Sequence, residues 1–496
     1  MSLPEKLYTA EQTRLLDSSA IEHHRIPGMT LMERAGESAF TLLRTRWSKL
    51  RRLLVFCGIG NNAGDGYVLA RLAHNAGLAV TVLAVGEPDR LGGDALQAYE
   101  LCRDAGVDIL PYDPDAVVDC QIMVDALFGT GLDREVTGHW LQAIQAMNQR
   151  PKRVPLLSLD IPSGLHADHG VAMAEAVEAT ATITFIGVKT GLLTGAGMDY
   201  TGELFFDDLF IPAEVYDTVE SSVRRLTKRK MRDLKPQRKP SMHKSEAGHL
   251  VVLGGDIHMG GAARLAGEAA YRSGAGIVSI GTHESHSNCL HITCPELMVY
   301  GVASLHSARE LVEKGEVVAI GPGLGHDSWG RYLFHATIDL PLPFVVDADG
   351  LNLLAENPRK RDDWILTPHP GEAARLLKKD TVDIQRDRFD AVRQICKQYG
   401  GVCVLKGAGT LIAADGSDEI YLCSQGNAGM ATAGMGDVLT GIIAGLLVQK
   451  LRPMDAACLG VWLHANAGDR VKESQGAVGM RASDLMLEIR IALNHL

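Results

Sequence analysis

The first half of the chain alternates short apolar runs with longer amphipathic segments. Each run is continuous in apolar residues, which is typical of a strand buried on both faces of a parallel sheet. Strands that alternate with helices predict a doubly wound α/β sheet, in which ligands bind beyond the carboxyl ends of the strands. The expected strands are residues 53–57, 80–85, 121–125, 156–160 and 181–186.

Two segments near the start of the chain predict helices. Residues Thr9 to Gln12 and Thr30 to Glu33 both match the capping-box pattern, in which a Thr and a Gln or Glu three residues later cap each other's backbone. Pro27 and Gly28 separate the two segments. We therefore expect one helix to begin at each Thr.

The second half repeats the alternation with different loops. Each of its apolar runs ends in a polar or glycine-rich loop, so one rim of a second sheet is predicted to hold a large polar ligand. A small-residue segment, 259–267, predicts a helix that a ligand or strand approaches closely. The expected strands are residues 249–254, 316–320, 344–346, 364–366 and 402–405.

A chain of 496 residues is longer than a domain with a single hydrophobic core usually is, which predicts more than one domain. The sharpest change in composition is the Lys- and Arg-rich segment 224–244. We interpret it as a solvated linker, although Lys244 or His243 could instead reach into a phosphate site. The predicted domains are residues 1–222 and 241–496, and the predicted basic linker is 223–240.

Charge, apolar run length and cysteine content argue against several classes of protein. The formal net charge of −11 argues against a nucleic-acid partner. No uninterrupted apolar run reaches the length of a membrane span. Nine cysteines without a C-x-x-C pair suit a reducing compartment and no zinc knuckle. We expect a cytoplasmic homo-oligomer with small-molecule ligands and with no nucleic-acid or membrane partner.

A glycine-rich loop, residues 58–66, follows the first expected strand and precedes an expected helix at 67–76. Gly58, Gly60 and Ala63 fit the dinucleotide fingerprint in its strand–turn–helix context. The acidic residue that usually binds the ribose is not evident at its usual distance. The loop therefore predicts binding of a nucleotide-like ligand without hydride transfer.

A second glycine-rich loop, residues 426–437, opens into an apolar run, 438–448, that predicts a helix. Convergent backbone N–H groups and the positive end of a helix can hold an anion. Asp437 would lie beside a bound phosphate, placed to take a proton from the group being phosphorylated. The alternative is an Asp that only caps the helix.

Four oxygen-bearing residues follow strands of the first sheet: Asn62, Asp125, Asp160 and Ser163. Oxygen ligands without histidine suit potassium, magnesium or calcium and not zinc. Any one of these residues could instead cap a helix. Together on one rim they indicate a cation or ligand site.

Three polar residues of the second half have two interpretations each. His369, held between two prolines, could bind a ligand or act as an acid, or could be a surface residue of a rigid turn. Lys406 could neutralise a phosphate or be solvated at a turn. His464 falls in a late helix, where packing is the favoured interpretation.

Taken together, these motifs resemble a known family, the bifunctional NAD(P)H-hydrate repair enzymes. In this family an epimerase domain is fused to an ADP-dependent dehydratase domain. The resemblance covers nearly the whole chain and implies a Rossmann-like first domain and a ribokinase-like second domain. The stretches that carry it are Met29–Glu33, Gly60–Gly66, Val124–Leu132, Leu159–Gly164, Thr367–Glu372, Leu405–Thr410 and Gly434–Gly441.

For the first domain the resemblance implies a substrate site for the hydrates NADHX and NADPHX and a potassium site. Asp160 would contact the hydrate and carry the proton transfers. Asn62, Asp125 and Ser163 would bind potassium. The residues implied to line the hydrate are Asn61, Asn62, Ala63, Gly64, Asp65, Gly129, Thr130, Gly131, Leu132, Asp133, Arg134, Glu135 and Asp160.

For the second domain the resemblance implies a site for the S hydrate and an adenine nucleotide. Asp437 would accept the proton of the ring hydroxyl, which ADP would phosphorylate, with release of AMP and phosphate. Magnesium is expected with the nucleotide, although no acidic cluster in the sequence identifies its ligands. The implied hydrate contacts are Ala263, Gly323, His369 and Asp437, and the implied nucleotide contacts are Lys406, Gly407, Ala408, Gly409, Thr410 and Gly436.

The chain departs from the family pattern at Ala63 and Ala433, where Gly is usual, and at Ala428, where Pro is usual. Two other functions stay open at the level of the sequence. One is a vitamin-precursor kinase of the hydroxymethylpyrimidine or thiazole type, whose phosphorylated product would persist. The other is a first domain that binds a nucleotide without catalysis, against which Asp125, Asp160 and Ser163 together argue.

Overall fold

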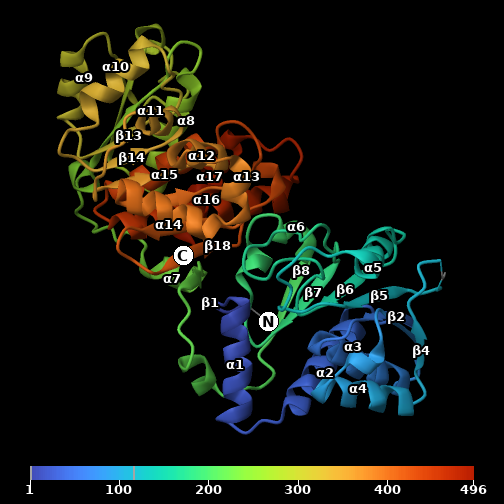
Figure 1. Ribbon diagram of the computed structural model, residues 1–496. Helices are drawn as coiled ribbons and strands as arrows, with labels where there is room; N and C mark the ends of the chain where they lie inside the picture. The colour runs from blue at the N-terminus through green and yellow to red at the C-terminus, as the bar shows by residue number, and fades with distance from the viewer. Residues whose placement is uncertain (1–2, 116–117) are drawn as a thin grey trace. The chain divides into compact units, whose positions relative to one another are not determined.

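The computed structural model describes residues 3–115 and 118–496. The chain divides into two compact units, Met1–Val223 and Arg224–Leu496, shown as ribbons in Figure 1. Each unit has its own sheet with helices packed on it. Among the described residues, no helix has the length and apolar character needed to cross a bilayer.

The first unit is built on a seven-stranded sheet of order β4-β3-β2-β5-β6-β7-β8, in which every neighbouring pair is parallel. Its strands are β2 (Arg52–Cys57), β3 (Ala79–Ala84), β4 (Asp108–Pro111), β5 (Ile122–Ala126), β6 (Leu156–Leu159), β7 (Ala181–Phe185) and β8 (Glu203–Asp207), and β1 (Lys6–Leu7) precedes them. Its helices are α1 (Ala10–Glu22), α2 (Gly28–Arg46), α3 (Asn61–Asn75), α4 (Gly93–Asp104), α5 (Gly138–Asn148) and α6 (Gly197–Thr201).

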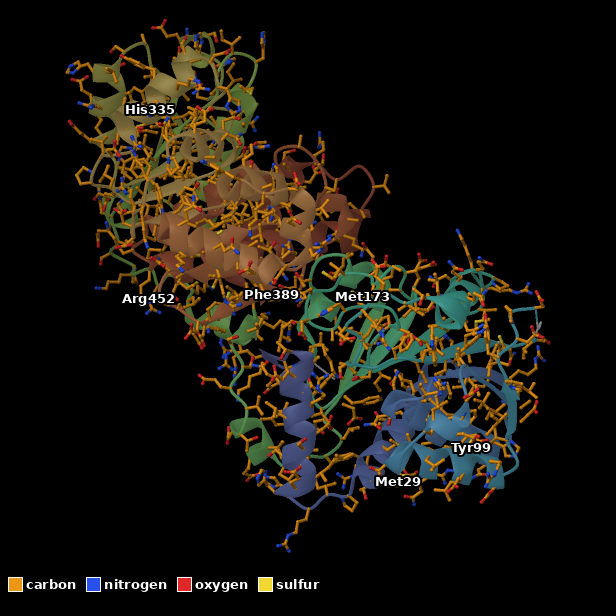
Figure 2. The ribbon with its side chains drawn as sticks, viewed as in Figure 1. Met29, Tyr99, Met173, His335, Phe389 and Arg452 are labelled. Atoms are coloured by element: carbon orange, nitrogen blue, oxygen red, sulfur yellow. The ribbon has the colours of Figure 1, made fainter. Side chains whose placement is uncertain are left out.

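Side chains of the central strand β2 alternate between two cores, because successive residues of a strand point to opposite faces. Leu53 and Val55 belong to the core under α1 to α4, and Leu54 and Phe56 belong to the core under α5. Within the first core, Tyr99 of α4 lies edge-on to a buried tyrosine of α3, with ring centroids 5.2 Å apart (Figure 2). The predicted doubly wound α/β sheet is thus confirmed.

In the second unit the sheet runs in the order β18-β17-β16-β15-β14-β13-β10-β11-β12. The pairs from β16 to β12 are parallel, and those that join β16, β17 and β18 are antiparallel. Its strands are β10 (His249–Leu253), β11 (Ile277–Thr282), β12 (Met298–Gly301), β13 (Val317–Ile320), β14 (Phe344–Val346), β15 (Trp364–Leu366), β16 (Val402–Leu405), β17 (Thr410–Ala414) and β18 (Ile420–Cys423).

One core of this unit joins the sheet to the long helices α8, α15, α16 and α17. α15 packs along α8, where an added Cβ at Gly441 would lie 2.0 Å from the carbonyl oxygen of Ala266. The helices are α8 (Gly260–Ser273), α9 (Leu305–Val312), α10 (Ser328–Thr337), α11 (Ala348–Glu356), α12 (Pro370–Leu377), α13 (Thr381–Arg386), α14 (Arg388–Tyr399), α15 (Met435–Leu447), α16 (Pro453–Gln475) and α17 (Leu485–Asn494).

The segment that we predicted to be a solvated basic linker, 223–240, contains regular structure. It holds β9 (Val223–Arg225) and α7 (Lys228–Asp233). The backbone N–H of Leu226 donates to the carbonyl of Leu422, 2.8 Å away, and Lys230 donates to the hydroxyl of Tyr421 at 2.8 Å. This part is therefore not a structureless linker, because it contains a strand and a helix, although Lys228, Arg229 and Arg232 are exposed as a solvated segment requires.

Two local predictions also need correction. The second capping box is absent, since α2 begins at Gly28 with Pro27 as its N-cap and places Thr30 inside the helix. The loop after β2 is shorter than expected, because α3 begins at Asn61 and takes residues 61–66 into its first turns. The first capping box, at Thr9 and Gln12, is confirmed.

Candidate functional sites

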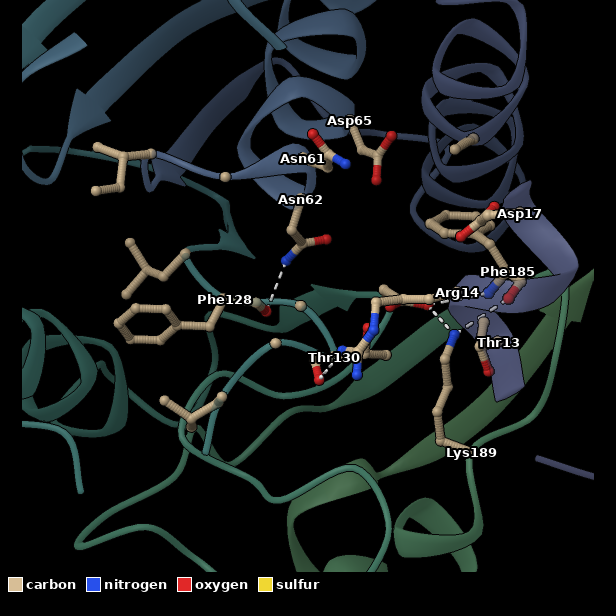
Figure 3. Close-up of a pocket in the computed structure, with 18 of the residues that line it drawn as sticks. Thr13, Arg14, Asp17, Asn61, Asn62, Asp65, Phe128, Thr130, Phe185 and Lys189 are labelled. Carbon is tan, nitrogen blue, oxygen red and sulfur yellow. Dashed lines mark hydrogen bonds and ion pairs between the residues drawn. The ribbon is translucent and has the colours of Figure 1, made fainter. Parts of the chain in front are cut away.

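A cavity of about 800 Å³ opens in the first unit. It is lined by α1, α2, the start of α3, the segment after β5 and the carboxyl ends of β6 and β7 (Figure 3). Among the residues that line it are Asn61, Asn62, Asp65, Gly129, Thr130, Gly131, Leu132, Asp133, Arg134, Glu135 and Asp160.

Two predicted substrate residues, Ala63 and Gly64, are not among those that line this cavity. Ala63 is fully buried. A Cβ added at Gly64 would lie 2.5 Å from the sulfur of Met32 and 3.1 Å from the Cα of Ala95. Both small residues thus allow α3 to pack closely against its neighbouring helices.

Gly58 and Gly66 of the same loop have this kind of role, whereas a Cβ added at Gly60 would meet nothing within 4 Å. A Cβ added at Gly58 would lie 2.1 Å from the carbonyl oxygen of Leu127. One added at Gly66 would lie 2.6 Å from the Cβ of Ala126 and 2.9 Å from the sulfur of Cys57. These contacts bring the start of α3 close to the sheet, so that Asn61, Asn62 and Asp65 reach the cavity.

Asp160 lies at the carboxyl end of β6 with a backbone φ of 63°, which is uncommon for a non-glycine residue. Its Oδ1 pairs with Lys189 and accepts from the hydroxyl of Thr184 and the N–H of Phe185, both at 3.3 Å. Within the described part of the chain, its Oδ2 accepts no hydrogen bond. A Cβ added at Gly129 would lie 3.8 Å from that oxygen. One oxygen of Asp160 is therefore fixed and the other faces the cavity.

Lys189, which our interpretation of the sequence missed, is 1 % exposed. Besides pairing with Asp160, its Nζ donates to the carbonyl of Phe185 at 3.1 Å (Figure 3). It also donates to the hydroxyl of Thr184 at 3.0 Å. A lysine between apolar residues, Val188-Lys189-Thr190-Gly191-Leu192, is the signal that would have identified it. Buried lysines are rare unless they are paired.

The charges of this pair act on two more carboxyl groups. Burial, together with the charge of Asp160, raises the pKa of Asp17 to about 6, although Lys189 lowers it. Burial and the charges of Asp160 and Asp17 raise the pKa of Asp65 well above its ordinary value. The cavity thus holds three carboxyl groups near one buried lysine, and Asp17 and Asp65 retain protons more readily than ordinary aspartates.

The three predicted cation ligands lie together beside the cavity. Asp125 is fully buried, and among the residues with described positions it accepts hydrogen bonds only from neutral donors, namely Ser158, Ser163 and the N–H of Leu127. Burial raises its pKa. Asn62 donates to the carbonyl of Phe128 at 2.8 Å, and within the described residues its buried Oδ1 has no partner. An unpaired oxygen next to a buried carboxylate and a serine fits a bound potassium ion.

In the second unit the carboxyl ends of three strands bring Asp347, Glu372 and Lys406 together. Lys406 Nζ lies 2.6 Å from Asp347 Oδ1 and 3.6 Å from Glu372 Oε2. Asp347 Oδ2 accepts from the hydroxyl of Thr440 at 2.7 Å. Although burial opposes both charges, each partner stabilises the other, so that the pKa of Asp347 is lowered and that of Lys406 is raised.

Asp437 lies in the first turn of α15, whose N-cap is Gly434 with a φ of 88°. It is therefore not the N-cap residue that the alternative interpretation required. Burial and the charge of Asp347 raise its pKa to about 7, while Lys406 lowers it. A carboxyl group with this pKa can accept a proton near neutral pH. We had not identified Asp347 or Glu372, whose charges add to this shift, as functional residues from the sequence.

His369 is the N-cap of α12. Its Nδ1 accepts from the N–H groups of Gly371 and Glu372, at 2.9 and 3.3 Å, and its Nε2 lies 3.3 Å from Glu372 Oε1. Burial and the charge of Lys406 lower the pKa of His369. The ring is therefore neutral near pH 7 and presents an Nε2–H donor, which disfavours the acid role considered from the sequence.

The remaining predicted residues lie around the same rim. Gly323 follows β13, and a Cβ added there would lie 2.8 Å from Met259 Cβ and 3.1 Å from Ala262 Cβ, so it meets the start of α8 beside the fully buried Ala263. Gly407 and Ala408 are exposed, Gly409 is buried, and Thr410 begins β17. A Cβ added at Gly436 would lie 3.4 Å from Lys406 Nζ. His464 is at the centre of α16, where burial lowers its pKa to about 4.

Comparison with known proteins agrees with this two-part arrangement. Residues 28–191 match the family model described as YjeF-related protein N-terminus, and residues 250–490 match the model described as NAD(P)H-hydrate dehydratase. The chain is 45 % identical to the bifunctional NAD(P)H-hydrate repair enzyme Nnr of Coxiella burnetii over 98 % of this chain and 99 % of that one. The chain belongs to the family of bifunctional NAD(P)H-hydrate repair enzymes.

Other members of this family are similar over the whole chain. The Escherichia coli Nnr is 42 % identical over 100 % of this chain and 95 % of its own length. Among solved structures, a ribokinase-like protein of Enterococcus faecalis matches 55 % of this chain and 96 % of its own, with 28 % identity and a TM-score of 0.52. An ADP/ATP-dependent NAD(P)H-hydrate dehydratase of Bacillus subtilis, co-crystallised with ATP and magnesium, matches 54 % and 97 %, with 30 % identity and a TM-score of 0.50. The second unit is thus ribokinase-like, as predicted.

Proposed function

We propose that the two repair activities of this chain are divided between its two units. The cavity of the first unit interconverts the R and S forms of NADHX and NADPHX. The site around Asp437 dehydrates the S form to NADH or NADPH with ADP, releasing AMP and phosphate. The observation that carries this division is that each unit has its own lysine–aspartate pair, Lys189 with Asp160 and Lys406 with Asp347. Each unit also has its own carboxyl group left to react, Asp160 in the first and Asp437 in the second.

In the first unit, the nitrogen lone pair of the hydrated ring expels the neighbouring hydroxyl, and water returns on either face. Asp160 would act through Oδ2, the oxygen that faces the cavity, because Lys189 holds Oδ1. With a proton on Oδ2 at the start, it would give that proton to the leaving oxygen and take one back from the incoming water, so that the cycle consumes no net proton. Arg14, which donates to the carbonyl of Thr130 at 3.5 Å, would close one side of the cavity.

Potassium would be held by Asn62, Asp125 and Ser163, whose oxygens fit it. When bound, it would neutralise the buried carboxylate and fix the segment that carries Phe128 and Gly129. A test that does not depend on activity is the thermal stability of the protein in potassium against sodium. The wild type should gain stability from potassium, and Asn62→Ala should lose that gain.

In the second unit, Asp437 would accept the proton of the ring hydroxyl while ADP transfers its terminal phosphoryl group to the oxygen. The ring nitrogen would then expel phosphate. Lys406 to Thr410 and Gly436 would hold the adenine nucleotide, and Ala263, Gly323 and His369 would contact the hydrate. Among the described residues, no group of three or more His, Cys, Asp or Glu could hold a metal ion, so magnesium would enter with the nucleotide phosphates.

A vitamin-precursor kinase would use the same aspartate but release a stable phosphate ester. The match of residues 250–490 to a dehydratase family favours dehydration. For the whole protein, we further propose a cytoplasmic homo-oligomer.

The deciding experiment follows recovery of the reduced-nicotinamide absorbance from a mixture of both NADH-hydrate epimers with magnesium, potassium and ADP. Full recovery that requires ADP supports both activities. Recovery that stops after one epimer is consumed would show that the first unit is inactive. No recovery with ADP or ATP would refute the dehydratase assignment, and a phosphorylated product that persists would replace it with the kinase.

A further inference from the structure

Arg388, the first residue of α14, is a buried cation beneath the loop that links β16 to β17. It is 1 % exposed. Its Nη2 donates to the carbonyl oxygens of Leu405, Lys406 and Gly409, at 3.2, 3.3 and 3.5 Å. Its Nη1 donates to the side chain of Gln385 at 2.9 Å. One guanidinium group thus gathers three carbonyls of one loop.

No carboxylate is paired with Arg388 among the residues that the structure describes. All four of its hydrogen-bond acceptors are neutral. Burial without a compensating charge lowers the pKa of Arg388 to about 10, so it stays charged near neutral pH. A buried charge of this kind is costly unless an anion compensates it.

Lys406, which we had expected to neutralise a phosphate, is already compensated. Its ammonium group lies between Asp347 and Glu372. Its charge therefore attracts a further anion only weakly. Arg388 lies on the other side of the same loop, and its charge is not cancelled in this way.

The loop between the two cations turns one face toward Arg388 and the other outward. Gly407 is exposed and has a φ of 133°, and a Cβ added there would lie 3.0 Å from Arg388 Nη1. In a trans peptide the C=O and the following N–H point in opposite directions. Because the carbonyl of Lys406 points at Arg388, the N–H of Gly407 points away from it. An outward N–H over a positive charge can help to hold an anion.

We propose that Arg388 is a positioning residue for the adenine nucleotide, which holds the loop from Leu405 to Gly409 in its binding form and whose charge favours the nucleotide's phosphates. The inference rests on the proposed function of the second unit. It explains why Gly stands at 407, since a side chain there would meet the guanidinium group.

The test separates the charge of Arg388 from its hydrogen bonds. Arg388→Gln removes the charge but keeps an amide donor. Arg388→Lys keeps the charge but loses the planar guanidinium group, whose N–H donors bond several carbonyls at once. In the full-length protein, the KM for ADP is measured in the dehydration of the S hydrate, together with the Ki of adenosine as a competitor of ADP. Adenosine lacks phosphates, so its Ki depends on the shape of the loop and not on the attraction between Arg388 and phosphate.

For Arg388→Gln we expect the KM for ADP to rise about tenfold or more, while the Ki of adenosine changes less than about threefold. Arg388→Lys should keep most of the preference for ADP over adenosine. The matched control is Arg393→Gln, an exposed arginine on the same helix, which should leave both constants unchanged.

Equal weakening of ADP and adenosine in Arg388→Gln would overturn the proposal and leave only a structural role. Unchanged constants would overturn it as well. If Arg388→Gln does not fold, Arg388→Lys decides, because loss of the preference for ADP despite a retained charge contradicts the proposal. A wild type that shows no ADP-dependent recovery would instead refute the proposed function itself.

Discussion

The two units contain the same pair of groups, a buried lysine against an aspartate at the end of a parallel strand, but they use it differently. In the first unit Lys189 holds one oxygen of Asp160, and the other oxygen faces the cavity. In the second unit Lys406 and Thr440 occupy both oxygens of Asp347. The first aspartate is free to react, whereas the second is fully engaged.

The difference explains why the second site needs a separate carboxyl group. Asp347 stays ionised because Lys406 lies beside it, and its fixed negative charge helps burial to raise the pKa of Asp437 to about 7. An aspartate whose two oxygens are both bonded can therefore still raise the pKa of a neighbouring carboxyl group. In the first unit the corresponding effect falls on Asp17 and Asp65, which surround the reactive aspartate.

The largest effect is expected for Asp437→Asn. This change removes the proton acceptor of the second site, so dehydration should fall by about 10²–10⁴-fold, the range for a positioned general base. Epimerisation, followed by the exchange between R and S hydrates without ADP, should not change. Equal loss of both activities would contradict two separate sites.

The next largest effect is expected when either member of the lysine–aspartate pair in the first unit is replaced. Asp160→Asn should lower epimerisation by about 10²-fold or more. Lys189→Met should lower it by a similar factor, because it frees Oδ1 and leaves a half-buried carboxylate without its cation. The readout is the rate of R-to-S exchange, with ADP-dependent dehydration of pure S hydrate as the internal control.

Two outcomes would contradict the roles given to Asp160 and Lys189. If Asp160→Asn epimerises at the wild-type rate, Asp160 is not the acid. If Lys189→Met lowers kcat only when the protein also loses its fold, as judged by circular dichroism, Lys189 has a structural role alone.

A smaller effect is expected in the pH profile of dehydration. Asp437 must be ionised to accept a proton, so kcat/KM should rise as the pH rises through about 7 and then level off. Lys406 lowers the pKa of Asp437, so Lys406→Met should move this rise to higher pH. A rise centred near the ordinary value of 3.8 would show that Asp347 does not tune Asp437.

The strands of both sheets were largely predictable because buried parallel strands are continuous apolar runs. β2, β14 and β15 were located within one residue. The strands that we missed include β4 and β8, at the edges of the first sheet, where exposed positions mix polar and apolar residues. β17 was missed because its first residue, Thr410, continues a glycine-rich loop.

The candidate sites were predictable where a motif carries them and not where a pair forms across the fold. Asp160, Asp125 and Asp437 lie in recognisable loops. Asp160 and Lys189 follow different strands, β6 and β7, and only the sheet brings them together. Arg388 begins a helix with nothing in its local sequence to mark it, and it became evident only from the three carbonyls around it.

The smallest expected effect is on the free energy of unfolding. Its size can be compared between the two sites. Asp437 and Asp17 have pKa values of about 7 and about 6 in the folded protein, against an ordinary value of 3.8. Between about pH 4 and these values the folded state binds more protons than the unfolded state. The free energy of unfolding therefore falls as the pH rises through each window, and the loss is complete above it.

Replacing either aspartate with asparagine should remove that loss. At pH 8 we expect Asp437→Asn to gain about 2 kcal/mol and Asp17→Asn about 1 kcal/mol, after allowance for partial solvent screening, while neither should gain at pH 4. Urea unfolding at both pH values measures this. Each variant is compared within the transition of its own unit, because the two units need not unfold together. A larger gain for Asp17→Asn than for Asp437→Asn would reverse the ranking and show that burial and neighbouring charge together raise the pKa of Asp17 more than that of Asp437.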